Sequence, residues 1–116
     1  MSDHLSIGRR GEEIAQAYVR KHCTILHTNW KAGRKELDII AVQKGVVYFI
    51  EVKTRSSARF GWPETAVNYK KQEHIQLVAA AYLERFDLHP PAIRFDIIAI
   101  TFTGDDYELM HLRDVF

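Results

Sequence analysis

The stretch from Glu36 to Lys53, ELDIIAVQKGVVYFIEVK, constrains the fold most, because it reads as two apolar strands joined by a tight turn. Its two halves, 37–42 and 46–52, are rich in Ile, Val, Tyr and Phe, which favour a pleated strand. The residues between them, QKG, include a glycine that can adopt the positive φ of a tight turn. The sequence therefore predicts a β-hairpin that is apolar on both faces, as in a sheet covered by helices on both sides.

Two acids and a lysine meet at one end of this hairpin. A two-residue turn at Lys44 and Gly45 places Asp38 directly opposite Glu51, and Lys53 falls on the same face as Glu51 because side chains alternate along a strand. Like charges that face each other in a sheet are destabilising unless something compensates them. A divalent cation would do so, since Mg²⁺ in proteins usually takes one or two carboxylates and completes its shell with water and substrate phosphate.

This pattern predicts a metal site with a defined chemistry. We expect Asp38 and Glu51 to bind Mg²⁺ or Mn²⁺, and Lys53 to support the attacking water or the pentacovalent phosphate. Glu12, in a predicted first helix, is a third candidate acid, although an acid in a first helical turn is also a common surface feature. Glu36 shares the face of Asp38, but its place at the start of the strand favours a solvated charge.

The remaining pattern predicts an α/β fold with a central mixed sheet flanked by helices. Hydrophobic periodicity predicts helices over about 7–21 and 63–85, strands over 23–30, 93–103 and 107–112, a basic turn over 31–35 and a loop over 54–63. The order is helix, three strands, helix, two strands. A strand that follows a crossover helix is expected to run parallel to an earlier one. Asp96 lies in the apolar 93–103 strand, where we expect a structural pair with Arg94.

Length and composition favour one domain over residues 1–116, with 47% hydrophobic and 27% charged residues. The single cysteine, Cys23, excludes an intramolecular disulfide and a cysteine-based zinc cluster, and fits a reducing compartment. No apolar run approaches the roughly 18 residues of a membrane span, and the first ten residues lack the apolar core of a signal peptide. We therefore expect a cytoplasmic protein without a membrane partner.

The charge is unevenly divided along the chain. Residues 1–71 carry 13 Lys and Arg against 7 Asp and Glu, whereas residues 72–116 carry 3 against 8. The basic part contains the hairpin, which favours a phosphate-binding surface, although solvated surface charge is an equal alternative. The predicted nucleic-acid-binding residues are Arg9, Arg34, Arg55, Arg59, Lys70 and Lys71.

Asp38, twelve intervening residues and then Glu51-Val52-Lys53 resemble the PD-(D/E)xK signature of restriction-endonuclease-like nucleases. Over a longer span, from Gly8 to about Ile98, the segments GRRGEEIA, TNW, ELDIIA, FIEVKTR and RFDII resemble the bacterial YraN-like family, which is related to archaeal Holliday-junction resolvases. The resemblance implies a restriction-endonuclease-like core, with Glu12 as the resolvase-like N-terminal acid. Leu37 stands where the signature has proline, and Lys35 where the family commonly has glycine.

Three hypotheses follow. The first is a Mg²⁺-dependent endonuclease that binds DNA and hydrolyses phosphodiester bonds, on branched or otherwise structured substrates. The second is a nucleic-acid-binding module of the same fold without catalytic activity of its own. The third is a buried ion-pair network, which would leave one of the two hairpin carboxylates uncompensated. A homodimer would suit a four-way junction.

Overall fold

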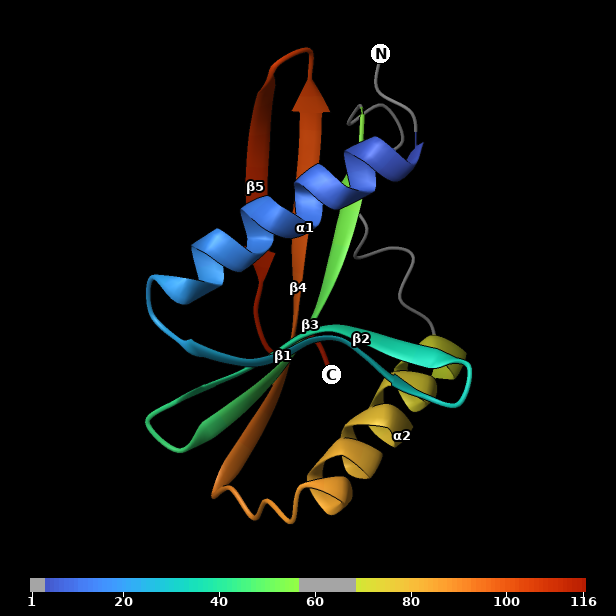
Figure 1. Ribbon diagram of the computed structural model, residues 1–116, viewed down its shortest axis with the longest axis vertical. Coiled ribbons are helices and arrows are strands. Elements are labelled where there is room, and N and C mark those ends of the chain that lie inside the picture. The colour runs from blue at the N-terminus through green and yellow to red at the C-terminus, as the bar shows by residue number, and fades with distance from the viewer. Residues whose placement is uncertain (1–3, 57–68) are drawn as a thin grey trace.

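The computed structural model describes residues 4–56 and 69–116 (Figure 1). The elements are α1 (His4–Arg20), β1 (Thr24–Ala32), β2 (Lys35–Gln43), β3 (Val46–Arg55), α2 (Tyr69–Arg85), β4 (Ala92–Thr103) and β5 (Asp106–Leu112). All five strands form one sheet in the order β1-β2-β3-β4-β5. The predicted α/β class and element order are confirmed, and the arrangement is compatible with a restriction-endonuclease-like core.

The β2–β3 hairpin has the predicted turn, and the predicted register holds from Gln43 to Ile39. The predicted pair of Asp38 with Glu51 was wrong, because the two strands stop pairing at Ile39 and Ile50. Lys44 and Gly45 both have positive φ, 49° and 80°, as a type I′ turn requires. Pairing runs from Gln43 opposite Val46 to Ile39 opposite Ile50. On its other side β3 pairs in parallel with β4, as expected for strands joined through a crossover helix, and β4 pairs antiparallel with β5. The sheet is therefore mixed.

The two helices cover opposite faces of this sheet. Phe49 and Ile50 are neighbours in β3 and so point to opposite faces, and they belong to two separate hydrophobic clusters. The cluster around Phe49 contains Tyr82 of α2, whereas the cluster around Ile50 contains Ala15 of α1. In Figure 1, α1 lies across β3, β4 and β5. Helix α2 lies beside the part of the sheet formed by β1 and β2, which it contacts. The prediction of a sheet covered on both sides is confirmed.

The sheet opens where β2 and β3 stop pairing. Their last pair is Ile39 with Ile50, yet β3 continues along β4 to Arg55. In Figure 1 the β1–β2 ribbon turns away from β3, β4 and β5, and its turn lies beside the start of α2. We call this opening, between residues 35–38 of β2 and 51–55 of β3, the fork. Helix α1 packs closely against the β3 side of the fork, since a Cβ atom built on Gly11 would clash with the side chain of Thr54.

Several predicted boundaries were wrong. Thr54 and Arg55, expected in a loop, are the last residues of β3, because parallel pairing with β4 extends the strand. The basic turn is shorter than predicted, since β1 continues to Ala32 and β2 begins at Lys35. Residues 57–63 of the predicted loop, including the predicted start of the second helix at Pro63, lie outside the described residues. Within 4–56 and 69–116, neither helix has both the length and the apolar character needed to cross a bilayer.

Candidate active site

Asp38 lies at the fork, one residue beyond the last β2–β3 pair. Its Oδ2 accepts a hydrogen bond of 2.7 Å from the backbone N–H of Val52. Val52 lies two residues beyond Ile50, the last residue of β3 with a partner on β2, so its N–H has lost the carbonyl that a continued ladder would supply. The carboxylate takes the place of that carbonyl. Asp38 therefore lies where the pairing of the two strands ends, and the N–H of Val52 holds its carboxylate in place.

Negative charge accumulates around this carboxylate. Burial, and then the charges of Glu12, Glu51 and Glu36, raise the pKa of Asp38 to about 7, although the hydrogen bond from Val52 acts in the opposite direction. Three acids from α1, β2 and β3 are thus close enough to influence one carboxyl group. The prediction that Asp38 and Glu51 share one end of the hairpin agrees with this arrangement.

Asn29 brings the third acid to the site. Its side-chain Nδ2 donates a hydrogen bond of 3.0 Å to Oε1 of Glu12. Asn29 lies in β1 between residues whose partners are Ile39 and Leu37, which places it across from Asp38. Its φ of 51° is unusual for a strand residue, and asparagine tolerates that conformation better than most side chains. Asn29 was not among the predicted site residues, and the TNW segment of the family resemblance is the only sequence signal for it.

Glu51 is held by two lysines through one oxygen. Its Oε1 accepts a hydrogen bond of 2.8 Å from Nζ of Lys53 and lies 3.0 Å from Nζ of Lys71. Its Oε2 is buried and has no hydrogen-bond partner among the described residues. Lys53 is beside the acid, as the alternation along β3 predicts. Lys71, predicted to bind nucleic acid, reaches the same carboxylate from α2.

The two ammonium groups influence each other. For Lys53, burial lowers the pKa, but the hydrogen bond to Glu51 and the nearby negative charge outweigh burial, so the pKa is raised. For Lys71, burial and the neighbouring Lys53 lower the pKa, and the attraction of Glu51 only partly offsets them. The pKa of Lys53 is thus raised and that of Lys71 is lowered, although both ammonium groups contact the same oxygen of Glu51.

The side chains at the fork offer a small, hard divalent cation two carboxylates, not a complete set of protein ligands. No group of three or more His, Cys, Asp or Glu side chains within residues 4–56 and 69–116 is arranged to hold a metal ion. Mg²⁺ needs only one or two carboxylates, however, and Oε2 of Glu51 is an oxygen acceptor to which no residue in 4–56 or 69–116 donates. The residues that fit a cation are therefore Asp38 and Glu51, and the lysines on Oε1 would compete with it.

A cavity of about 170 Å³ lies beside Glu51, between the fork and α2. Its lining includes Lys35 and Glu36 from the start of β2 and Lys71 and His74 from α2. Glu36 is also 3.9 Å from Lys31 in an exposed ion pair, which agrees with its interpretation as a solvated charge. Glu51 can thus be reached from outside, and the entrance carries two lysines.

The predicted nucleic-acid-binding residues do not all lie together. Arg34 and Lys70 are exposed, and the β1–β2 turn that carries Arg34 lies beside the start of α2, where Lys70 is (Figure 1). Arg9 is exposed on α1, and Arg55 is half-buried at the end of β3. Arg59 lies outside the described residues. The basic side chains nearest the cavity are therefore those of the β1–β2 turn and of α2.

Known proteins resemble this chain over its whole length. Residues 11–100 match the model of a family described as "Uncharacterised protein family UPF0102". A UPF0102 protein of Phocaeicola vulgatus is 42% identical over 117 aligned residues, which cover all of this chain and 96% of the relative. One from Rhodococcus opacus is 35% identical and is covered, like this chain, over its full length. The predicted YraN-like resemblance is confirmed at this level: the chain belongs to the UPF0102 family.

Proposed function

We propose that this protein is an endonuclease that depends on a divalent cation and hydrolyses phosphodiester bonds in branched or structured DNA. The observation that supports this most is the environment of Glu51, whose Oε2 is buried with no hydrogen-bond partner among the described residues and whose charge acts on a second carboxylate, Asp38. A buried carboxylate oxygen without a donor is costly, and a cation would satisfy it. A closed network of ion pairs would leave no such oxygen.

The chain's own residues divide the work as follows. Asp38 and Glu51 would hold the cation, which would supply Lewis-acid polarisation of a phosphoryl oxygen. Lys53 keeps its positive charge beside Glu51 and stabilises the charge that develops on the phosphate. Glu12, oriented by Asn29, positions the attacking water. Lys71 contacts the same carboxylate from α2 and adds a second positive charge beside the position proposed for the phosphate.

The experiment is cleavage of labelled duplex, flap and four-way-junction DNA with Mg²⁺, with Mn²⁺ and with EDTA. Glu51→Gln keeps the shape of the side chain but removes its charge, and we expect it to abolish cleavage. Glu13→Gln is the matched control, because Glu13 is exposed on α1 next to Glu12. Cleavage that persists in EDTA or in Glu51→Gln would refute the proposal.

A nucleic-acid-binding module without catalysis is the alternative, and the two lysines on Glu51 favour it because they already neutralise the carboxylate. It predicts salt-dependent binding of all the DNA structures without cleavage of any. Replacing Lys70 with glutamine would then reduce the salt slope by roughly 0.9. Lys44→Gln, at the opposite end of the β1–β2–β3 ribbon, is the control.

A further inference from the structure

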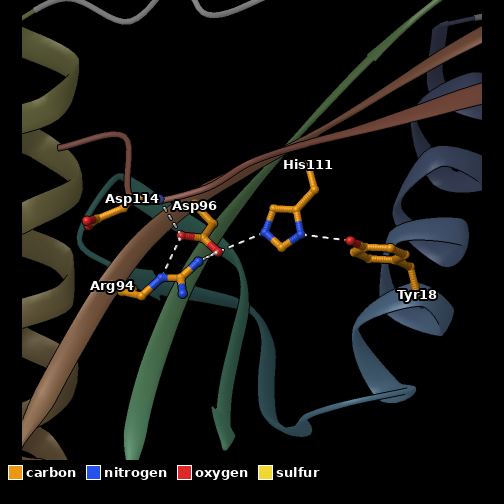
Figure 2. Close-up of polar contacts among 5 residues, drawn as sticks. All are labelled: Tyr18, Arg94, Asp96, His111 and Asp114. Carbon is orange, nitrogen blue, oxygen red and sulfur yellow. Dashed lines mark hydrogen bonds and ion pairs between the residues drawn. The ribbon is translucent and has the colours of Figure 1, made fainter.

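A second polar cluster lies on the face of the sheet opposite Glu51. Asp96 of β4 is only 2% exposed, and it is on the same face as Ile98, which packs under α1. Three groups donate to its carboxylate: Nη2 of Arg94 at 2.9 Å, Nε2 of His111 at 2.8 Å and the backbone N–H of Asp114 at 2.9 Å. The predicted pair with Arg94 is confirmed, and it is one part of a larger network (Figure 2).

The network keeps Asp96 charged. Burial raises the pKa of this carboxyl group, but the hydrogen bonds from His111, Asp114 and Arg94 together hold it below its usual value. An ionised carboxylate can only accept, so Nε2 of His111 donates to Asp96 and Nδ1 is the ring nitrogen left for a second partner.

The second partner of the His111 ring is Tyr18 of α1. Its hydroxyl is 2.8 Å from Nδ1 of His111, and the two rings meet edge to face with centroids 5.5 Å apart. Figure 2 shows the chain of contacts from Asp96 through His111 to Tyr18, which spans β4, β5 and α1. A carboxylate that orients an imidazole, which in turn binds a hydroxyl, is the arrangement that proteins use to polarise a hydroxyl group. None of these three side chains belongs to the fork.

The cluster lines a cavity of about 320 Å³, within the usual range for small-molecule sites. Tyr18, Arg94, Asp96 and His111 all contribute to its wall, and Arg113 adds a second guanidinium group. The Arg94 guanidinium lies 4.9 Å from the centre of the Tyr48 ring, so that its position is fixed by an aromatic side chain as well as by Asp96.

Charge decides what this cavity would accept. Arg94 and Arg113 against Asp96 leave one net positive charge when the histidines are neutral. We propose that the cavity is a second ligand site, separate from the fork, which binds a small organic anion through a carboxylate or phosphate group. Arg113 meets the anion at the exposed rim, and the Tyr18 hydroxyl and the His111 ring lie deeper and contact the rest of the ligand.

The test is an NMR titration of ¹⁵N-labelled protein with sodium phosphate and, separately, with sodium acetate, at constant ionic strength set by chloride. We expect saturable shifts of the His111 ring and of the Tyr18 amide with at least one probe, and the probe that binds identifies the anionic group. Shifts that do not saturate, or that chloride alone reproduces, would overturn the proposal.

Two substitutions locate the binding. Arg113→Gln, at an exposed position, should weaken anion affinity about tenfold through loss of a charge-assisted hydrogen bond. Arg85→Gln, exposed on α2 at the other face, should leave the affinity unchanged. Tyr18→Phe keeps the ring but removes the hydroxyl, and it should lower the affinity for the anion without changing Mn²⁺ binding at the fork. Wild-type anion affinity in Arg113→Gln would overturn the assignment, whatever the outcome of the cleavage assay.

Discussion

Asp38→Asn should change how the stability of this protein depends on pH. The pKa of Asp38 is raised in the folded state, from 3.8 to about 7, mainly by burial. Between these two values the folded protein binds more protons at this position than the unfolded chain does, so the free energy of unfolding falls as pH rises. Asparagine carries no charge at any pH, and its side-chain oxygen can still accept from Val52.

The shift sets the size of the effect. A difference of about three pKa units corresponds to about 4 kcal/mol at 1.36 kcal/mol per unit. That is a large fraction of the roughly 5–15 kcal/mol by which a domain of this kind is stable. The penalty is absent below pH 3.8, where Asp38 is protonated in both states, and is complete above about pH 7. The free energy of unfolding of Asp38→Asn should therefore rise relative to that of wild type as pH increases through this range, by up to about 4 kcal/mol.

Urea unfolding at a series of pH values, with EDTA present, measures this difference. Comparing two proteins cancels the contributions of groups that do not interact with Asp38, including Asp96, whose lowered pKa acts in the opposite direction. Asp105→Asn, at an exposed turn position, is the matched control and should run parallel to wild type. Parallel curves for Asp38→Asn and wild type would refute the conclusion that burial and neighbouring acids destabilise the charged form of Asp38.

Three further outcomes are expected. At pH 8, added Mg²⁺ or Mn²⁺ should raise the melting temperature of wild type more than that of Asp38→Asn, because only wild type offers both carboxylates; equal shifts in a thermal melt would contradict the assigned ligands. Gly11→Ala should lower the free energy of unfolding by about 1–3 kcal/mol, since the new Cβ clashes with Thr54, and Thr54→Ala should restore part of the loss in urea titrations. Asp96→Ala should cost about 3–5 kcal/mol, because it leaves the Arg94 cation without its carboxylate, and a loss below about 1 kcal/mol would show that the pair contributes little. The stability that Asp96 contributes is present above pH 3.8 and is lost on acidification through its lowered folded-state pKa.

The hairpin and the helices were predictable because their signals are local. Lys44-Gly45 between two apolar runs favours a type I′ turn, and that turn determines the register of the whole β2–β3 pair. The apolar stripe of α2, which includes Val78 and Tyr82, repeats at the helical period and is buried as expected. Such features depend on residues only a few positions apart.

The partners of the site residues were less predictable, because they come from distant elements. Lys71 was placed among phosphate-binding residues, and it reaches Glu51 only because α2 packs beside the start of β2. Asn29 donates a hydrogen bond to Glu12, and its backbone has a positive φ that no short-range pattern in β1 predicts. The contact between Tyr18 and His111 joins residues 93 positions apart. Each of these contacts depends on how the helices settle on the two faces.

The sequence by itself determined that Asp38, Glu51 and Lys53 lie at the same end of one hairpin, since turn chemistry and the alternation of side chains are enough to place them. Only the tertiary structure decided that β2 and β3 separate at that end and that Asp38 accepts a hydrogen bond from the N–H of Val52. It also decided that one oxygen of Glu51 is buried with no donor in the described part of the chain. The physical reason is that burial and electrostatic environment are set by all the elements packed around a residue.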